Sequence, residues 1–415
     1  MTHVRDRLDV AVHEVRLAAR SLTRNRMRTI ISLSAITFGV VALLLSGGFI
    51  EWIFGAMRET AIQTGLGHIQ ITRPGFREAG FADPKAYLLP PGATELDLAR
   101  KAPGVSAVGE RLLVSGLASS GEKTVAFAGL GVDPDAEKAL NKYLIIDTDN
   151  LDAGDRSGVL LGRGLADNLG VKAGAKITFL VTAPGGGISA AEAHLLGTFS
   201  TSVKANDDTA VRMPLELARE LLRYQGAHAW VVAVTATEHT DETLAYLRAR
   251  LPPEKFELRS WFDLSDFYRK SVVLLSRQLD VVTLLIGLII VLGISNILTM
   301  SVLERTGEIG TILALGTSRA SVLRMFVFEG VLLGVLGAFA GLIIGVALAL
   351  VISYFGIPMP PPPGRDVGYY AEITLTTHLA WLGVAMAVLP AALASIYPAW
   401  KAARLPIVDS LRHNR

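Results

Sequence analysis

The sequence contains no cysteine and has few charged residues for its length. Disulfides, thiol nucleophiles and thiolate metal sites are therefore excluded from this chain. Charged side chains make up 19% of the 415 residues, whereas a soluble domain carries about 25%, and the mean hydropathy is +0.42. The apolar surplus exceeds what a packed core and a water-facing surface can hold, so much of it is expected to face lipid.

Four apolar runs are long enough to cross a membrane, which takes about 20 helical residues. The first run begins too late and is too long to be the apolar part of a cleavable signal peptide. The sequence therefore predicts a membrane protein with four transmembrane α-helices. The expected spans are residues 29–50, 279–303, 325–353 and 378–399.

Lysine and arginine are concentrated in the segments 1–28, 304–324 and 400–415. Together these segments hold 14 basic and six acidic residues, whereas the loop 354–377 holds one arginine. By the positive-inside rule, the three basic segments are cytoplasmic. We therefore expect a multi-pass protein of the inner (cytoplasmic) membrane with both termini inside, an amphipathic N-terminal segment, and residues 51–278 in the periplasm or outside the cell.

The large segment between the first two spans has a mixed α+β pattern. Alternating strand-like runs and short helical patterns are each bounded by glycine, proline or charge. The expected strands are 68–74, 112–118, 124–132, 175–181 and 229–236, and the expected helices are 164–170, 214–224 and 241–251. Residues 51–65 and 262–278 have helical spacing of apolar positions, so both are predicted to continue the spans as a helical stalk.

The third span carries glycine at a four-residue spacing. Glycines on one helix face let a second helix approach closely, because no side chain separates the backbones. The partner helix belongs either to this chain or to a second copy. The glycines are Gly330, Gly334, Gly337, Gly341 and Gly345.

No catalytic or metal-binding pattern stands out, and His68 and His194 are interpreted as structural residues. The stretch from Gly116 to Thr124 resembles a phosphate-binding loop only superficially, because Glu122 separates the second glycine from the lysine. A hairpin turn is predicted there instead. The proline-rich run 358–364 indicates a stiff polyproline spacer in the outer loop. No nucleotide site and no nucleic-acid partner are expected in this chain.

The loop between the second and third spans predicts a short amphipathic helix. Its apolar residues Ile309, Ile312 and Leu313 fall on one side of such a helix. Gly316 suits the C-terminal cap of this helix, and Ser318 suits the N-cap of the next one.

This loop also resembles the signature of the MacB/LolCDE/FtsX family of ABC-transporter permeases. The matching residues are Arg305, Glu308, Ile309, Gly310, Ala314, Leu315, Gly316, Glu329 and Gly330. Near the C-terminus, the residues from Pro398 to Arg404 and from Asp409 to Arg412 are similar to the closing motif of the family. There the order Leu405, Pro406 shifts the usual proline slightly.

Two runs in the large segment extend the resemblance. The run from Val159 to Gly174 is similar to a glycine- and leucine-rich motif of the family, and the run from Gly67 to Ile71 is similar to the start of the domain in LolC- and LolE-type members. The resemblance implies a Porter-like subdomain with a Sabre-like insertion near residues 130–212, carried on the helical stalk.

The family resemblance implies a permease subunit that is not itself an enzyme. A separate ABC ATPase dimer would bind ATP and Mg²⁺, and a second permease copy, identical or related, would complete the complex. The implied ATPase-coupling residues are Glu304, Arg305, Glu308, Ile309, Gly310, Ala314, Leu315 and Gly316. Ile309 and Leu315 would be apolar anchors for the ATPase, and Glu304, Arg305 and Glu308 would make polar contacts with it. Glu329 lies in the third span, within the membrane lipid, and is interpreted as a structural polar residue rather than one with a role in transport.

Three functions remain open within this family. The first is extraction of lipoprotein or lipid from the outer leaflet, with a lipoprotein chaperone, and the Gly67–Ile71 run favours it. The second is MacB-like efflux of peptides or drugs with a periplasmic adaptor and an outer-membrane channel. The third is FtsX-like regulation of a cell-wall hydrolase, for which the large segment is longer than expected. In each case the resemblance implies mechanotransmission, in which ATP-driven motion passes through the stalk.

Overall fold

The computed structural model describes residues 26–80, 82–141, 145–147, 149–183, 186–201, 204–360, 368–404 and 406. The chain divides into a helical unit (Met1–Phe54, Val272–Pro358 and Tyr370–Arg415) and a strand-rich unit (Gly55–Ser271 and Met359–Tyr369). The expected N-terminal amphipathic segment, most of the proline run and the closing motif from Asp409 to Arg412 lie outside the described residues.

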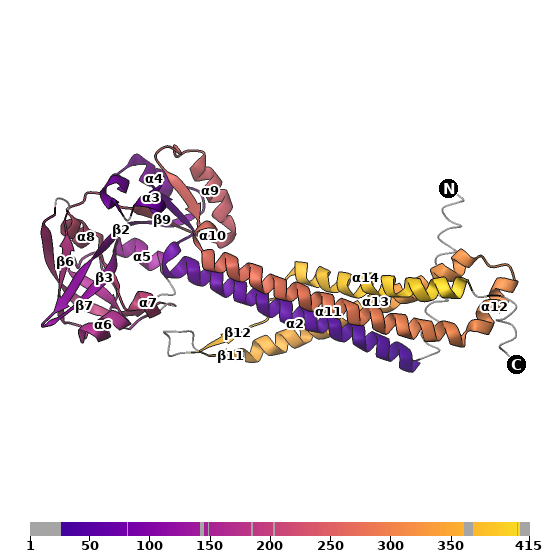
Figure 1. Ribbon diagram of the computed structural model, residues 1–415. Helices are drawn as coiled ribbons and strands as arrows, with labels where there is room; N and C mark the ends of the chain where they lie inside the picture. The colour runs from indigo at the N-terminus through magenta and orange to yellow at the C-terminus, as the bar shows by residue number, and fades with distance from the viewer. Residues whose placement is uncertain are drawn as a thin grey trace. The chain divides into compact units, whose positions relative to one another are not determined.

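The helical unit is built on helices that are long and apolar enough to cross a membrane. Among the described residues there are four such helices, and the four expected spans lie within them. Figure 1 shows them as long coiled ribbons. They are α2 (Arg26–Ala61), α11 (Asp266–Glu304), α13 (Arg319–Phe355) and α14 (Thr377–Ala403).

Helices α2, α11 and α13 are all much longer than a bilayer requires, and α2 and α11 also connect the two units. Helix α2 has 36 residues and α11 has 39, whereas about 20 cross the hydrocarbon layer. The boundary between the two units falls inside each helix, after Phe54 in α2 and before Val272 in α11. Of the expected stalk segments, residues 51–61 and 266–278 are uninterrupted helix, whereas Gly65 departs from helical geometry and Ser265 ends a short helix just before α11 begins.

The glycines of α13 are used for packing inside this chain. A Cβ atom placed on Gly337 would lie 2.5 Å from Ile36 Cγ2, so only glycine allows this approach. The first two glycines contact α14 and the other three contact α2. The contacts pair Gly330 with Ser395, Gly334 with Ala391, Gly337 with Ile36, Gly341 with Val40, and Gly345 with Leu44. This settles the alternative between an internal contact and a dimer contact for these residues.

The strand-rich unit contains one sheet of ten strands in the order β10-β1-β9-β2-β3-β8-β5-β7-β4, with β6 paired to both β2 and β7. The strands are β1 (Ile69–Thr72), β2 (Val105–Ser120), β3 (Lys123–Val132), β4 (Ile145–Ile146), β5 (Gly158–Gly162), β6 (Lys176–Thr182), β7 (Ile188–Ser200), β8 (Ala210–Pro214), β9 (Ala229–Val234) and β10 (Glu257–Ser260). Outside this sheet, β11 (Ile357–Met359) and β12 (Tyr369–Ala371) flank the proline-rich loop in the chain.

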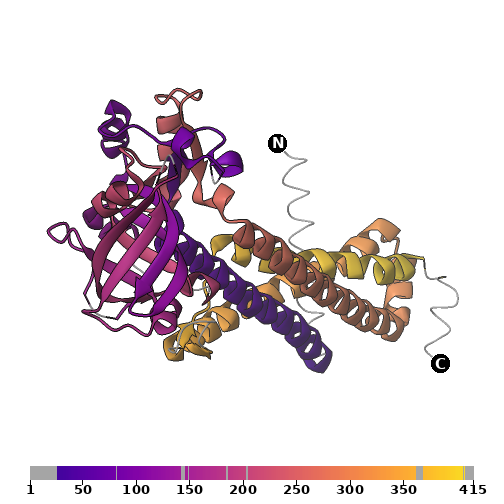
Figure 2. The same ribbon diagram turned by 60° about the vertical axis from the view of Figure 1, so that its left-hand side comes forward.

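Six of the ten strands close into a ring. The ring runs β2-β3-β8-β5-β7-β6 and returns to β2, because β6 pairs antiparallel with both of its neighbours. Its strands lie side by side in Figure 2. Alternate residues point inward and form a cluster in which Phe127 and Phe179 meet edge to face, with ring centroids 5.0 Å apart. Closure of the ring leaves no free strand edge along this part of the sheet.

A second hydrophobic cluster lies where β9, β1 and β10 extend the sheet. Trp230, Ile69 and Phe256 pack there with residues of α4 and α9. The helices of this unit are α3 (Phe76–Ala79), α4 (Thr94–Arg100), α5 (Pro134–Leu140), α6 (Arg163–Leu169), α7 (Lys204–Asp207), α8 (Leu215–Leu222), α9 (Thr240–Arg248) and α10 (Trp261–Leu264), with short turns η1 (Ile62–Leu66), η2 (Pro84–Tyr87) and η3 (Thr237–His239). The Porter-like and Sabre-like division stays a prediction.

The expected strands and helices of this unit are confirmed by β1, β2, β3, β6 and β9 and by α6, α8 and α9. The expected hairpin is confirmed as well. Ser120 pairs with Lys123 across the turn between β2 and β3, and Gly121 takes φ of 59° there. The left-handed conformation explains the glycine, since a side chain would be strained at that φ.

Candidate functional site

The short helix expected between the second and third spans is present as α12 (Thr306–Ala314). Its C-terminus ends in a Schellman arrangement, in which the Gly316 N–H donates to Leu313 O and the Thr317 N–H donates to Ile312 O. Gly316 has φ of 95°, as that motif requires. Ser318 then caps α13 by accepting a hydrogen bond from the Ser321 N–H at 3.2 Å. Both expected caps are confirmed, and together they fix where α12 ends and α13 begins.

One face of α12 is buried inside the helical unit. Ile309, only 2% exposed, packs with Leu313 in a cluster that includes Phe326 of α13 and Ala399 of α14. Gly310 is buried beside it. Ile309 is therefore not available as an apolar anchor for a partner, contrary to the sequence-based expectation. The physical reason is that the apolar stripe of an amphipathic helix is first used to attach it to its own unit.

The opposite face of α12 and the turn after it are open. Leu315 is 82% exposed, and Ile312 is 40% exposed. Glu304, Glu308, Ala314 and Gly316 are exposed as well, whereas Arg305 is half-buried. Among the expected coupling residues, the open face therefore combines apolar and acidic side chains, with Leu315 as its most exposed large hydrophobic residue.

Glu329 is a buried carboxyl residue within α13. It precedes Gly330, whose Cα side faces Ser395 of α14, and Ser395 itself is fully buried. Its interpretation as a structural polar residue stays a prediction.

The end of α2 is held in the strand-rich unit by two buried arginines that share one carboxylate. We call Arg111, Glu137 and Arg212 the arginine clamp. Arg111 Nη2 lies 3.2 Å from Glu137 Oε2, and Arg212 Nη1 pairs with the other carboxylate oxygen. Arg212 Nη2 donates to Thr64 O at 3.1 Å, and Arg111 Nη1 donates to Gly65 O. The clamp therefore binds the last turn of the helix to β2, β8 and α5.

The charge of the clamp matches the position of the helix end. Two guanidinium groups face one carboxylate, which leaves a surplus positive charge among buried groups. The C-terminal end of a helix carries unpaired carbonyls and a partial negative charge. Burial lowers the pKa of Arg111 to about 10. Burial, followed by the charge of Arg111, lowers the pKa of Arg212 to about 9. Both arginines therefore stay charged at neutral pH.

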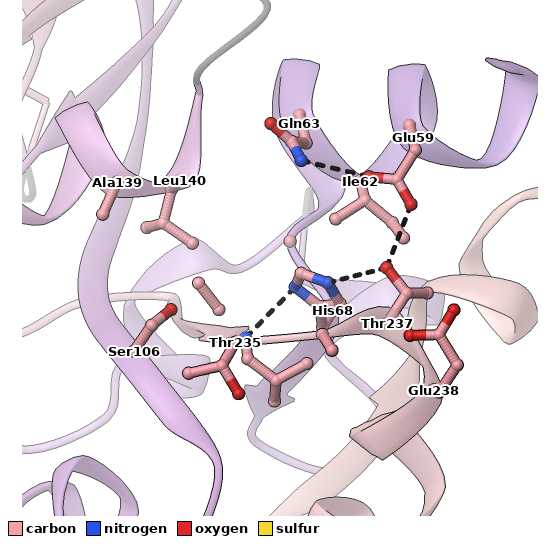
Figure 3. Close-up of a pocket in the computed structure, with 14 residues that line it drawn as sticks. Glu59, Ile62, Gln63, His68, Ser106, Ala139, Leu140, Thr235, Thr237 and Glu238 are labelled. Atoms are coloured by element: carbon pink, nitrogen blue, oxygen red, sulfur yellow. Dashed lines mark hydrogen bonds between the residues drawn. The ribbon is translucent and has the colours of Figure 1, made fainter. Parts of the chain in front are cut away.

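A cavity of about 240 Å³ lies beside the last turns of α2. Glu59 of α2, Gln63 of η1, His68 before β1 and Thr237 of η3 line it, and Figure 3 shows dashed hydrogen bonds that connect these side chains. The His68 imidazole is buried and accepts the Val234 N–H at Nδ1. This agrees with the interpretation of His68 as a structural residue.

His194 also has a structural setting. Its Nε2 lies 2.9 Å from Asp155 Oδ2, and its Nδ1 lies 3.3 Å from Ser157 Oγ. Asp155 at the same time accepts the backbone N–H groups of Ser157 and Gly158, as a turn-forming aspartate does. Among the described residues no cluster of three or more His, Cys, Asp or Glu side chains could hold a metal ion.

Two family models match this chain. Residues 29–250 match the MacB-like periplasmic core domain, and residues 281–407 match the FtsX-like permease C-terminal domain. The first match alone covers more than half of the chain, and the second covers α12 and the last two long helices. The chain belongs to the MacB/FtsX family of permeases. It is thus an ABC-transporter permease with a periplasmic-type domain.

Curated relatives of this MacB/FtsX-family permease carry two kinds of name. The lipoprotein-releasing system transmembrane protein LolC of Xylella fastidiosa is 27% identical over 308 residues, which cover 68% of this chain and 72% of that protein. LolE of Haemophilus influenzae is 27% identical, with 60% and 62% covered. The macrolide export ATP-binding/permease protein MacB of Rhodospirillum rubrum is 27% identical over 96% of this chain and 60% of that protein.

Two solved structures are similar to part of this permease. The periplasmic region of MacB from Actinobacillus actinomycetemcomitans is 11% identical, with a TM-score of 0.37, and the match covers 51% of this chain and 95% of that one. The extracellular domain of the transporter YknZ from Gram-positive bacteria is 12% identical, with a TM-score of 0.34, covering 46% and 99%.

The sequence did not reveal the arginine clamp of this permease. One signal was present, because Arg212 interrupts the otherwise apolar strand β8. A charge at such a position faces either solvent or a buried partner. Glu137 gave no signal, because it lies in a short helix among other charged residues. Only the ring of strands brings the three side chains together.

Proposed function

We propose that this chain is a permease subunit that converts ATP hydrolysis on a separate cytoplasmic ATPase dimer into movement of its strand-rich unit outside the membrane. The observation that carries this proposal is the continuity of α2 and α11. Each runs without interruption from an apolar, membrane-length segment into the strand-rich unit. A continuous helix transmits displacement along its axis, because each backbone hydrogen bond resists stretching.

The input of this mechanism is the open face of α12. Leu315 and Ile312 offer an apolar surface, and Glu304 and Glu308 surround it with negative charge. An exposed apolar patch rimmed by polar groups is typical of a protein interface. The partner ATPase would supply the binding site for ATP and Mg²⁺, and a second permease copy would complete the complex.

The orientation follows from the distribution of charge. The basic segments support an orientation with α12 and both termini in the cytoplasm and the strand-rich unit in the periplasm or outside the cell. The membrane is the inner (cytoplasmic) membrane. This arrangement puts α12 where ATP is available and puts the strand-rich unit where a substrate is received.

The substrate class we favour is lipoprotein or another lipidic molecule taken from the outer leaflet. The relatives named as lipoprotein-releasing LolC and LolE proteins support this, since the LolC match covers 72% of that relative. Efflux of peptides or drugs, with an adaptor and an outer-membrane channel, is the second candidate. The observation that favours it is the MacB match, which covers 96% of this chain.

A reconstitution experiment separates these candidates. The permease is placed in liposomes with its ATPase, identified from the neighbouring genes, and with either a fluorescent triacylated lipopeptide or erythromycin. ATP-dependent release of the lipopeptide to an added lipid-binding chaperone supports lipid extraction. ATP-dependent transfer of erythromycin alone supports efflux. Site-specific fluorophores on the strand-rich unit report its movement. If they show no ATP-dependent movement, the proposal is overturned.

The coupling surface has its own test. Leu315→Asp places a charge on the exposed anchor, and we expect ATPase binding to weaken by about 30-fold or more, as loss of an interface hot spot does. Ile309→Val, at a buried position on the same helix, is the matched control and should leave binding unchanged. Equal binding by the wild-type protein and Leu315→Asp would exclude this face as the input.

A further inference from the structure

We propose that Glu59, Thr237 and His68 form a latch that fixes the direction of α2 where it enters the strand-rich unit. The three residues come from three places in the chain, namely the last turns of α2, the turn η3 and the start of β1. The position of the latch follows from the hydrogen bonds alone. Its mechanical role rests on the proposed function.

The hydrogen bonds of the latch have a defined polarity. His68 Nδ1 accepts the Val234 N–H at 3.2 Å, so the neutral ring carries its proton on Nε2. The Nε2–H then donates to Thr237 Oγ1 at 3.3 Å. The Thr237 hydroxyl in turn donates to Glu59 Oε1 at 3.0 Å. Figure 3 shows this chain of bonds from β9 to the stalk helix. The threonine hydroxyl is the link on which the whole chain depends.

The latch gives α2 a second point of attachment. The arginine clamp holds the carbonyls of Thr64 and Gly65, and Glu59 precedes Thr64 by five residues, or about 7 Å of helix rise. The clamp's point of attachment lies within η1, in which Gly65 departs from helical geometry (φ 171°, ψ −30°), whereas Glu59 belongs to α2. A helix held only at its end can pivot about that end. A helix held at two points along its axis has a fixed direction.

His68 also contacts the start of α10, the short helix that leads into α11. The Trp261 N–H donates to His68 O at 2.8 Å, at the residue where α10 begins. A capping box between Ser260 and Asp263 fixes that helix start, which precedes α11 in the chain. His68 therefore connects to α2 through its side chain and to the start of α10 through its backbone. It is a positioning residue for α2 and for α10, the short helix that precedes α11 in the chain.

The cavity makes the latch able to open. Its volume of about 240 Å³ borders all three latch residues, and its lining includes further polar groups such as Ser106 and Thr235. Water can enter a polar space of this size and replace the bonds that are lost. Opening the latch therefore creates no new void, whereas opening the clamp would expose a buried ion pair.

Glu59 also keeps partners on its own helix when the latch opens. Gln63 Nε2 donates to Glu59 Oε2 at 3.0 Å, and Arg58 Nε lies 3.5 Å from Glu59 Oε1. The other carboxylate that lines the cavity is that of Glu238. The Glu59 carboxylate therefore has polar partners whether the latch is closed or open, which makes the latch reversible.

The test compares three variants of the full chain in lipid nanodiscs by hydrogen exchange. Thr237→Val keeps the side-chain shape but removes the hydroxyl, and Thr237→Ser keeps the hydroxyl. Thr235→Val is the matched control, because Thr235 lines the same cavity. We expect Thr237→Val to speed amide exchange in the peptide 55–66 on the order of ten-fold, which corresponds to loss of a hydrogen bond to a charged group. Thr237→Ser and Thr235→Val should exchange like the wild type.

Two results would overturn the latch itself. One is exchange in Thr237→Val equal to that of the wild type. The other is an equal acceleration in Thr237→Val and Thr235→Val, which would mean that filling or emptying the cavity matters and the hydroxyl does not.

A second measurement tests the mechanical role. In the reconstituted complex we expect Thr237→Val to reduce lipopeptide released per ATP hydrolysed, with Thr237→Ser restoring it. Faster exchange with an unchanged ratio would overturn the mechanical role and leave the latch in place. A wild-type complex with no ATP-dependent movement would count against the proposed function instead, and the exchange result would still stand.

Discussion

The carboxylate of Glu137 on α5 and the guanidinium of Arg212 on β8 are buried together, 75 residues apart in the sequence. Their pairing also positions Arg212 for the carbonyl of Thr64, at the end of α2. A charged contact inside the strand-rich unit thus also contacts η1, the turn that directly follows the membrane-length helix α2. The pair lies in the interior, so water cannot substitute for either partner.

Neutralising Glu137 should therefore destabilise the strand-rich unit strongly. Glu137→Gln leaves Arg111 and Arg212 as like charges without a counterion, and we expect a loss of about 3–5 kcal/mol in the free energy of unfolding. Urea unfolding of the full chain in detergent, followed by tryptophan fluorescence, measures it. Glu192→Gln is the control, because its pair with Lys176 (3.6 Å) is exposed and contributes about 0–1 kcal/mol. Similar effects of the two variants would show that the clamp is not held by charge.

The buried imidazole of His228 predicts a loss of stability in acid. Its Nδ1 accepts the Leu113 N–H at 3.0 Å and its Nε2–H donates to Pro84 O at 3.1 Å, so the neutral ring fits the site. Burial lowers the pKa of His228, although the bond to Pro84 acts in the opposite direction.

Below the unfolded-state pKa of about 6.5, the unfolded chain therefore binds a proton that the folded chain does not. Stability present above that pH should therefore fall as the pH drops from 7 to 5. Thermal unfolding of the full chain across this range measures the slope. His228→Gln should flatten it, and an equally steep slope in that variant would contradict the assignment.

The glycine contacts of α13 predict a sharp difference between two glycine substitutions. Gly341→Ala places a Cβ atom 2.6 Å from Val40 Cβ, and we expect a loss of about 1–3 kcal/mol from overpacking. Gly293→Ala in α11 meets no atom within 4 Å and should be neutral or stabilising by up to about 1 kcal/mol, through helix propensity. Unfolding in mixed SDS micelles compares them. Equal stabilities would mean that α2 and α13 are not in direct contact.

The two faces of α12 should respond differently to truncation. Ile309→Ala removes buried atoms from the cluster with Phe326, so we expect a loss of about 2–5 kcal/mol in stability. Leu315→Ala removes exposed atoms and should change stability by less than about 0.5 kcal/mol. Thermal unfolding of the full chain without any partner distinguishes the two. A large loss in Leu315→Ala would place that side chain in the core.

Elements with strong periodicity were predictable from the sequence. The apolar runs gave the four long helices, and Gly316 and Ser318 gave the ends of α12 and α13 because their cap chemistry is local. β7 was missed, since its residues Ile188–Ser200 include alanines and a glutamate that blur the alternation. That strand is half exposed over its first part, so hydrophobic pattern alone does not define it.

Contacts between distant segments were not predictable. Closure of the ring depends on β6 reaching β2, and no local pattern encodes that pairing. Ile309 was taken for a surface anchor because the sequence shows which face of a helix is apolar but not what covers it. His68 was recognised as structural, but its bond to Thr237 joins residues 169 positions apart.

The contacts between α2 and α13 recur with a fixed offset. Gly337 meets Ile36, Gly341 meets Val40 and Gly345 meets Leu44, so each step along one helix matches an equal step along the other. In this arrangement each of these α2 side chains packs against its own glycine of α13. The two helices cannot slide continuously past each other, because each α2 side chain must leave the space at one glycine and enter the space at the next glycine, about 6 Å further along. Any axial motion between them is therefore all-or-none, with one helical turn as its smallest stroke.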